Sequence, residues 1–349
     1  MPTMTHSDPR RGTGRLSSAL LAPTLLAALV GVLAGCKEDS SPQPRVTPPG
    51  SVGSELVAYW YDPETRTSKQ AEGPMRYGRQ EGRWTYWHED GTKAAEGEFV
   101  EGLREGVWIG WHPNGAKQLE ANWKHGVLDG VSREWFADGT LAARTTFVAG
   151  EPEGKVERFH PGGAKAAVET WADGKPIGTW TSWHPDGTKA QEGSHEGGVK
   201  QGVWRTWHSN GQLSSEGTMV DGLGSGPFHE WWEDGTVRME GQMEAGRNVG
   251  TFRRWFPDGR LQAVRSFDES GRADGRACEW FPNGQLSSTG EFVAGKREGP
   301  WFAWTVQGAL LMDDEGAGRF EDDRRVGDLT AADVEGFDPS VCEAFRTKD

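Results

Sequence analysis

Apolar and polar residues alternate along short runs of seven or eight residues, and glycine-containing turns bound each run. In one such run Leu213, Ser215, Gly217 and Met219 fall on one side, with polar residues between them. A period of two over so short a length predicts β-strands rather than helices. The preceding run places Trp204 and Trp207 on opposite sides, so both faces of the predicted sheet carry aromatic rings.

The pattern repeats at a fixed interval. The glycines that close Asp-Gly, Asn-Gly and related turns are Gly91, Gly115, Gly139, Gly163, Gly187, Gly211, Gly235, Gly259, Gly284 and Gly308. Eight of the nine intervals are 24 residues and one is 25. A fixed period of this length indicates one supersecondary unit that stacks on its neighbours. The predicted fold is all-β: an elongated, single-layer antiparallel sheet of stacked 24-residue β-hairpins.

Two kinds of turn divide each unit into strand, turn, strand and turn. The first is typified by "HPDG", where Pro sets the first corner and Gly takes the left-handed position; the second is a glycine pair, as in "AGKREG". Further glycines lie in mid-strand, where a large ring on the neighbouring strand can lie flat over bare backbone. These are Gly97, Gly193, Gly217, Gly241 and Gly290.

The amino-terminal segment is typical of an export signal. Arg10, Arg11 and Arg15 precede the apolar run "SALLAPTLLAALVGVLAG", which ends at Cys36. "LAGC" resembles the bacterial lipobox, so residues 1–35 are predicted to be a lipoprotein signal peptide and Cys36 the lipid-attachment site. A cleaved secretory signal and a retained transmembrane helix are the alternatives. Residues 36–53, rich in Pro and polar residues, are predicted to be a disordered tether.

The remaining chain divides into three parts. Residues 54–74 resemble a degenerate hairpin that caps the sheet, residues 75–312 hold ten clear units, and residues 313–349 form a tail or cap with a short helix. The formal net charge is −14. Nucleic acid and anionic membrane surfaces require a basic face, so this charge disfavours both as partners.

The frame G-x-W-x-x-W-H-x-D/N-G-x-x-x-x-E-G-x-F-x-x-G-x-x-x-G, nearly unbroken from Gly82 to Gly106, resembles the MORN repeat variant family of bacterial proteins. The resemblance implies antiparallel hairpins stacked into a long twisted sheet. Some relatives carry an antitoxin label and other MORN repeats are linked to phospholipid. An export signal argues against a cytosolic antitoxin, and the acidic charge argues against phospholipid binding.

One aromatic residue recurs in every unit, and we call this set the aromatic ladder. It consists of Trp87, Trp111, Trp135, Phe159, Trp183, Trp207, Trp231, Trp255, Trp280 and Trp304. Packing within the sheet is its simplest role. A row of anchors for a protein partner and a stacking platform for sugar rings are the functional alternatives.

Histidine recurs at one repeat position: His88, His112, His160, His184 and His208. Neighbouring units lie two strands, or about 9.6 Å, apart, which is too far for one metal ion to bridge them. A packing role at the turn is predicted, and no metal or other cofactor is expected. The sequence also holds no G-x-S-x-G, Walker or H-E-x-x-H motif, and we predict that the protein is not an enzyme.

Cys278 and Cys342 remain once Cys36 is lipidated, and in an exported protein they are candidates for a disulfide. Thr330 to Asp333 resembles the capping box of one short helix. The prediction is that the tail folds back over the last hairpins and covers their exposed strand edge.

Together these features predict a non-catalytic, lipid-anchored cell-envelope protein that acts as a protein-interaction scaffold. Glycan or peptidoglycan binding through the aromatic ladder is the alternative, and an antitoxin-like role is the third. The predicted location is the outer membrane or the periplasmic face of the inner membrane, with membrane contact only through the lipid. The identity of the partner stays open.

Overall fold

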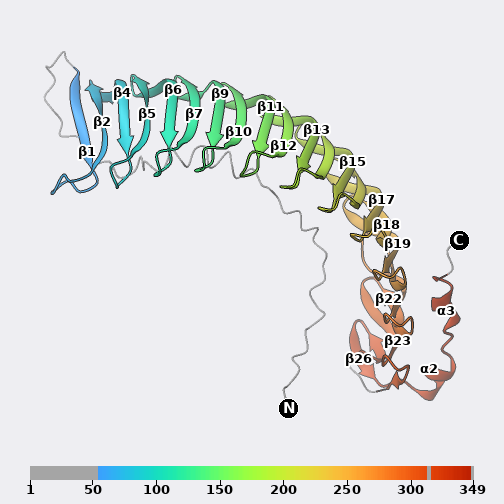
Figure 1. Cartoon of the computed structure of the whole chain (residues 1–349). Helices are drawn as coiled ribbons and strands as arrows, with labels where there is room; N and C mark the ends of the chain where they lie inside the picture. The colour runs from blue at the N-terminus through green and yellow to red at the C-terminus, as the bar shows by residue number, and fades with distance from the viewer. Residues whose placement is uncertain (1–53, 313–315, 347–349) are drawn as a thin grey trace. The chain divides into compact units, whose positions relative to one another are not determined.

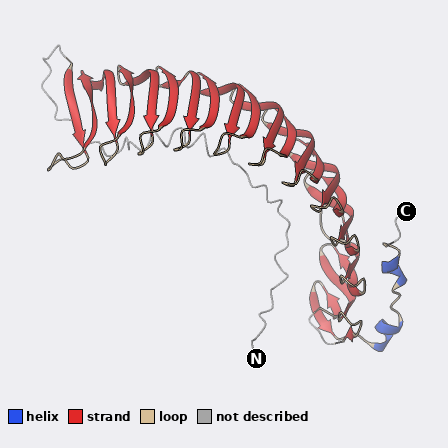
Figure 2. Ribbon diagram, viewed as in Figure 1, coloured by secondary structure: helices blue, strands red, loops and turns tan. Residues whose placement is uncertain are grey.

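The computed structural model describes residues 54–312 and 316–346. In these residues the chain is almost entirely β-structure, and short helices occur only near the carboxyl-terminal end (Figure 2). None of the helices in the described ranges has the length and hydropathy needed to span a membrane. The predicted signal peptide, the tether and Cys36 lie outside the described residues.

The strands alternate between two kinds (Figure 1). Outgoing strands run toward the Asp-Gly type of turn, and return strands run away from it. The outgoing strands are β1 (Glu55–Trp60), β3 (Arg79–Gln80) with β4 (Gly82–Trp87), β6 (Leu103–Trp111), β8 (Val127–Leu128) with β9 (Gly130–Trp135), β11 (Glu151–Phe159), β13 (Lys175–Trp183), β15 (Val199–Trp207), β17 (Leu223–Trp231), β19 (Arg247–Trp255), β21 (Gly275–Trp280) and β23 (Lys296–Trp304).

The return strands follow the Asp-Gly type of turn. They are β2 (Lys69–Arg76), β5 (Lys93–Val100), β7 (Lys117–Lys124), β10 (Leu141–Val148), β12 (Lys165–Ala172), β14 (Lys189–Glu196), β16 (Leu213–Val220), β18 (Val237–Glu244), β20 (Leu261–Phe267), β22 (Leu286–Val293) and β24 (Leu310–Leu311). A final hairpin and two helices complete the described chain: β25 (Gly318–Glu321), β26 (Arg324–Gly327), α2 (Ala331–Glu335) and α3 (Ser340–Glu343).

Strand pairing follows chain order throughout the described residues. Each return strand from β2 to β22 pairs antiparallel with the outgoing strand before it and with the one after it, as β16 does with β15 and β17. At the far end β23 pairs with β24 near Trp304 and with β25 near Trp301. The prediction of an all-β sheet of stacked antiparallel hairpins is therefore confirmed.

The two kinds of turn have different backbone geometries. In the first, the Gly115 N–H donates to the His112 carbonyl oxygen (2.8 Å) and Gly115 has a φ of +83°. In the second, Glu101 and Gly102 both have positive φ, +53° and +84°. Two successive residues with positive φ define a tight turn whose twist matches that of the flanking strands, which explains the glycine in this turn.

One face of the sheet, which we call the packed face, holds the most buried rings. Trp84, Trp108 and Trp204 on outgoing strands are only 1%, 1% and 4% exposed. Each lies flat on a glycine of the preceding return strand: a Cβ added to Gly97 would fall 2.2 Å from the Trp108 ring. A close contact with a ring occurs at each mid-strand glycine that the sequence singled out, and it is loosest at Gly217, where a Cβ would fall 3.1 Å from the Phe228 ring.

These contacts pair Gly97 with Trp108, Gly193 with Trp204, Gly217 with Phe228, Gly241 with Phe252 and Gly290 with Trp301.

Rings on the return strands complete the packed face. Phe99 meets the Trp108 ring edge-on with centroids 5.0 Å apart, and Phe292 meets Trp301 in the same way at 4.9 Å. Edge-to-face geometry is favourable for aromatic pairs at this separation. The core is therefore a row of rings that runs from one hairpin to the next.

The repeat also shows what happens where the ring is absent. Ala121 and Ser132 occupy the positions that Gly97 and Trp108 hold one unit earlier. In the following unit the same positions hold Thr145 and Val156. A side chain thus replaces the glycine where the facing residue is small. The next unit is an exception, because Glu169 takes the glycine position and Trp180 the ring position.

We expect Gly97→Ala to destabilise the protein by about 1–3 kcal/mol, because the new methyl group overlaps the buried Trp108 ring. Urea unfolding followed by tryptophan fluorescence measures this change. Gly327→Ala is the control, since a Cβ there meets nothing within 4 Å. An equal, small effect at both positions contradicts the proposed contact.

Candidate functional site

The aromatic ladder lies on the face opposite the packed face, which we call the ladder face. Each of its ten residues ends an outgoing strand, and Trp60 ends β1 in the same way. Trp255 and Trp280 are buried, with 8% and 3% of their surface exposed, and the other eight members are half-buried. Most ladder rings therefore keep surface that the fold does not use.

Lysines from the return strands lie over several ladder rings. The Lys93 Nζ is 5.2 Å from the centroid of the Trp111 ring, close enough for a cation–π interaction. Lys69 over Trp87, Lys117 over Trp135 and Lys189 over Trp207 repeat this contact at 5.3, 5.2 and 5.1 Å. Sequence reasoning missed these lysines, although a Lys-x-x-Glu pattern after the turn marks each of them.

The glutamate of this pattern pairs with the lysine. Lys93 contacts Glu96 at 2.9 Å, and Lys117 contacts Glu120 at 2.8 Å. The hydrogen bond from Lys117 keeps the pKa of Glu120 below its ordinary value. The lysines are thus held in place over the rings, and much of their charge is balanced within the sheet.

The lysine position changes character along the chain. Aliphatic residues take it in the later units: Leu213, Val237, Leu261, Leu286 and Leu310. Leu261 and Leu286 pack against the buried cluster around Trp280. The ladder consequently has a first part in which most rings alternate with lysine and a second part in which they alternate with aliphatic side chains.

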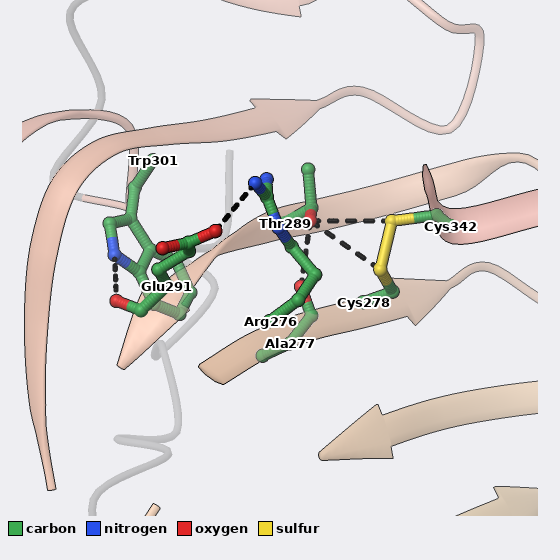
Figure 3. A network of polar contacts seen from close by, with 7 residues as sticks. All are labelled: Arg276, Ala277, Cys278, Thr289, Glu291, Trp301 and Cys342. Carbon is green, nitrogen blue, oxygen red and sulfur yellow. Dashed lines mark hydrogen bonds and ion pairs between the residues drawn. A yellow bond between two sulfur atoms is a disulfide. The ribbon is translucent and has the colours of Figure 1, made fainter. Parts of the chain in front are cut away.

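The carboxyl-terminal tail covers the end of the ladder face. Cys278 of β21 and Cys342 of α3 form a disulfide with Cα atoms 5.9 Å apart (Figure 3). Thr289 lies beside both sulfurs and donates its hydroxyl proton to the Ala277 carbonyl oxygen (2.7 Å). Both cysteines are buried, at 0% and 1% exposure, so the bond sits inside the contact between tail and sheet.

Aromatic and charged groups of the tail contact ladder residues directly. Phe337 lies 4.6 Å from the Phe302 ring and 5.3 Å from the Trp304 ring, measured between centroids. The Arg346 guanidinium lies 5.4 Å from the Trp280 centroid. A largely apolar cavity of about 540 Å³ remains between tail and hairpins, bordered by Leu286 and Trp304 among others.

The sequence predicted one helix in the tail, and the described part of the tail has two. The capping box of α2 is present, because Thr330 and Asp333 each accept a hydrogen bond from the other's backbone N–H. Helix α3 has no side-chain cap, so the sequence held no comparable signal for it. Burial of Cys342 and the disulfide to the sheet account for its position.

The recurring histidines link each turn to the next hairpin. The Nε2 of His112 lies 2.8 Å from the backbone oxygen of Trp135, and four other members repeat the contact at 2.8–3.0 Å. Since a carbonyl oxygen only accepts, this nitrogen carries the proton. Where Trp232 replaces histidine, its Nε1 donates to the Trp255 oxygen in the same way. The row thus has a structural role.

A second unusual cluster lies on the packed face where the rings are interrupted. Arg158 forms an ion pair with Glu169, and Glu169 also accepts a hydrogen bond from Trp171 Nε1 (2.8 Å). Burial raises the pKa of nearby Glu134 to about 7, although the charge of Arg158 opposes this. The cluster fills the space left by the missing rings, and sequence reasoning did not find it.

The described residues offer no grouping of three or more His, Cys, Asp or Glu side chains suited to hold a metal ion. What the ladder face provides is a row of half-buried aromatic rings at hairpin spacing, with cations or aliphatic side chains between them. Such a surface is suited to noncovalent binding, since large amphipathic rings dominate contact energies at interfaces.

The stacked hairpins place the protein in the class of open, non-globular repeat proteins, in which each unit contacts mainly its neighbours. Four segments match the MORN repeat variant, residues 80–101, 104–125, 200–221 and 273–294, and two match the MORN repeat, residues 96–107 and 289–300. The matched segments are therefore MORN-type repeats, and the resemblance found in the sequence is confirmed. MORN repeat proteins are generally non-catalytic.

Comparison with curated proteins gives no match. Among solved structures, matches include crystal structures titled TcdB2-TccC3-Cdc42, TcdB2-TccC3 and TcdB2-TccC3 without hypervariable C-terminal region. Each is 10% identical with a TM-score of 0.16, and they cover 69%, 74% and 70% of this chain. The chain spans only 14%, 17% and 14% of theirs, and at these values the likeness carries no argument.

Trp204 and Trp207 lie on opposite faces of one strand and allow a matched test of the two faces. We expect Trp204→Ala to cost about 3–5 kcal/mol, because it removes a buried ring from the packed face. Trp207→Ala should cost less, on the order of 1 kcal/mol, since its ring is only partly buried. Urea unfolding of both variants measures the difference, and equal losses contradict the assignment of faces.

Glu134→Gln tests the buried carboxyl group. The folded-state pKa is raised from 4.5 to about 7, so the carboxyl contributes most to stability below pH 4.5 and that contribution is lost as the pH rises to 7. Relative to the unchanged protein, the variant should gain at most about 3 kcal/mol between pH 4.5 and 8.

Unfolding midpoints of the two proteins at both pH values measure this gain. Glu157→Gln is the control, because the hydrogen bond from Lys155 lowers the pKa of Glu157 and its change has the opposite sign. A difference between Glu134→Gln and the unchanged protein that stays constant with pH contradicts the prediction.

Proposed function

We propose that the protein is a non-catalytic scaffold of the cell envelope, anchored by lipid on Cys36, that binds protein partners through the ladder face. The carrying observation is the contrast between the two faces. Rings such as Trp108 are buried on the packed face, whereas Trp111, Trp135 and Trp183 on the ladder face are half-buried. The rings of the packed face thus stabilise the fold, and the rings of the ladder face stay partly accessible to a partner.

A protein partner is favoured over a glycan by what lies on the rings. Sugar rings stack on the open face of an aromatic side chain, but Lys69, Lys93, Lys117 and Lys189 already lie over ladder rings. A protein surface can contact the exposed ring edges and displace or pair with these lysines through its own carboxylates. Tryptophan is enriched at protein interfaces, where it is a frequent anchor.

Site-specific photo-crosslinking in intact cells tests the proposal. A photoreactive residue at Thr181, which pairs with Glu192 beside the Trp183 ring, should yield discrete protein adducts. The same residue at the exposed turn position Asp186 should yield few. Cys36→Ser should move the protein from the membrane to the soluble fraction, because it removes the lipid-attachment site.

Cosedimentation with purified cell wall tests the alternative that the ladder face binds a glycan. Two results together contradict a protein-binding role. The protein binds the cell wall and loses this binding with Trp183→Ala, and no protein adducts form at Thr181. If the Cys36→Ser variant stays in the membrane fraction, the lipid anchor is contradicted. The binding role is tested separately, by the protein adducts at Thr181.

A further inference from the structure

The ladder face changes composition between Trp207 and Trp231. Trp207 has the Lys189 ammonium over its ring at 5.1 Å. Leu213 occupies the position equivalent to Lys189 in the next unit, and Trp231 pairs with Val237 in the sheet. Leu213, Trp231 and Val237 are all half-buried, and we call these three residues the docking stretch.

The tail shows which groups the aliphatic part of the ladder binds. It lies over the continuation of the docking stretch, where Leu261 and Leu286 take the lysine position. There the Arg346 guanidinium lies over the Trp280 ring, as Lys93 does over Trp111. A cation supplied by another segment thus replaces the lysine that these units lack.

An aromatic anchor accompanies that cation. Phe337 of the tail contacts Phe302 and Trp304, and Phe345 packs against the cluster around Trp280. The tail therefore presents apolar rings and one arginine to an aromatic and aliphatic surface. The docking stretch continues this surface on the side that is nearer the amino terminus.

Two glutamates beside the docking stretch already have cationic partners within the sheet. Glu216 lies opposite Arg205 on one neighbouring strand and opposite His229 on the other. Glu240 lies opposite His229 and Arg253 in the same way. The His229 ring stacks on Trp231 with centroids 5.7 Å apart. The ion pairs of Glu216 with Arg205 (2.5 Å) and of Glu240 with Arg253 (3.6 Å) balance these carboxylates. A cation in the partner is therefore inferred from the Arg346 guanidinium over the Trp280 ring.

We propose that the docking stretch binds a partner-protein segment of the same chemistry as the tail: a short apolar segment with an aromatic anchor and a neighbouring arginine or lysine. The proposal rests on the proposed scaffold function and specifies the partner. Its basis is continuity with the surface that the tail already occupies.

A labelled peptide tests the proposal. The probe is the sequence of residues 328–346 with Cys342→Ser, and the receptor is the full chain with Cys36→Ser and an intact disulfide. The receptor's own tethered tail excludes the peptide from the Trp280 end, because its effective concentration is on the order of millimolar. Fluorescence anisotropy should show saturable binding that a Phe337→Ala peptide loses by about tenfold or more.

Receptor variants locate the site. One variant combines Leu213→Lys with Val237→Lys and keeps Trp231. The residues around Trp231 then match those around Trp111, an arrangement that the fold already accommodates. This variant should bind the peptide about tenfold more weakly. The reverse change, Lys93→Leu with Lys117→Val, should create a second binding site around Trp111.

Absence of saturable binding, or unchanged binding by the Leu213→Lys, Val237→Lys variant, overturns the proposal. Circular dichroism and urea unfolding establish that this variant is folded before its binding is read. If the peptide test fails but protein adducts still form at Thr181, only the proposed chemistry of the partner is wrong. Loss of the adducts as well removes the scaffold function itself.

Discussion

The contact of a flat ring with a bare glycine is the constraint on which the rest of the structure depends. Trp108 on Gly97 and Trp204 on Gly193 bring the backbone of one hairpin against the ring of the next. Any side chain at the glycine overlaps the ring, so the contact fixes which residues face each other across neighbouring hairpins. The contact is absent between Trp108 and Trp204, where Ala121, Thr145 and Glu169 take the glycine position. In those units the 24-residue period and its turns keep the strands in chain order.

This constraint also places the rings that stabilise the fold and the rings available for binding on opposite faces of the sheet. Because alternate residues of a strand point to opposite faces, rings that pack on glycine leave the ladder rings on the other side. The ladder face is then free to vary, and it does: lysines accompany Trp111 and Trp135, whereas aliphatic residues accompany Trp231 and Trp255. Variation on one face over a shared sheet framework allows a repeat protein to acquire specificity without changing its fold.

The sequence allowed much of this to be predicted, because turn glycines, strand length and period are local signals. The glycines facing rings were also found, since Gly97 and its equivalents recur at one position. The lysines over the ladder rings were not, because Lys93 meets Trp111 only once the pairing of neighbouring hairpins is known. The buried carboxyl of Glu134 was missed for the same reason: its environment is formed by other strands.

The bond between Cys278 and Cys342 has a mechanical consequence. It joins residues 64 apart in sequence, so tension entering from the amino-terminal strands crosses to α3 through the two sulfurs. Strands β22 to β26 then lie within a closed covalent loop and carry little of the load. Residues 54–277 contain no cysteine, so the hairpins before β21 are joined to one another by noncovalent contacts and the backbone alone. Under traction they yield first and the carboxyl-terminal block stays intact.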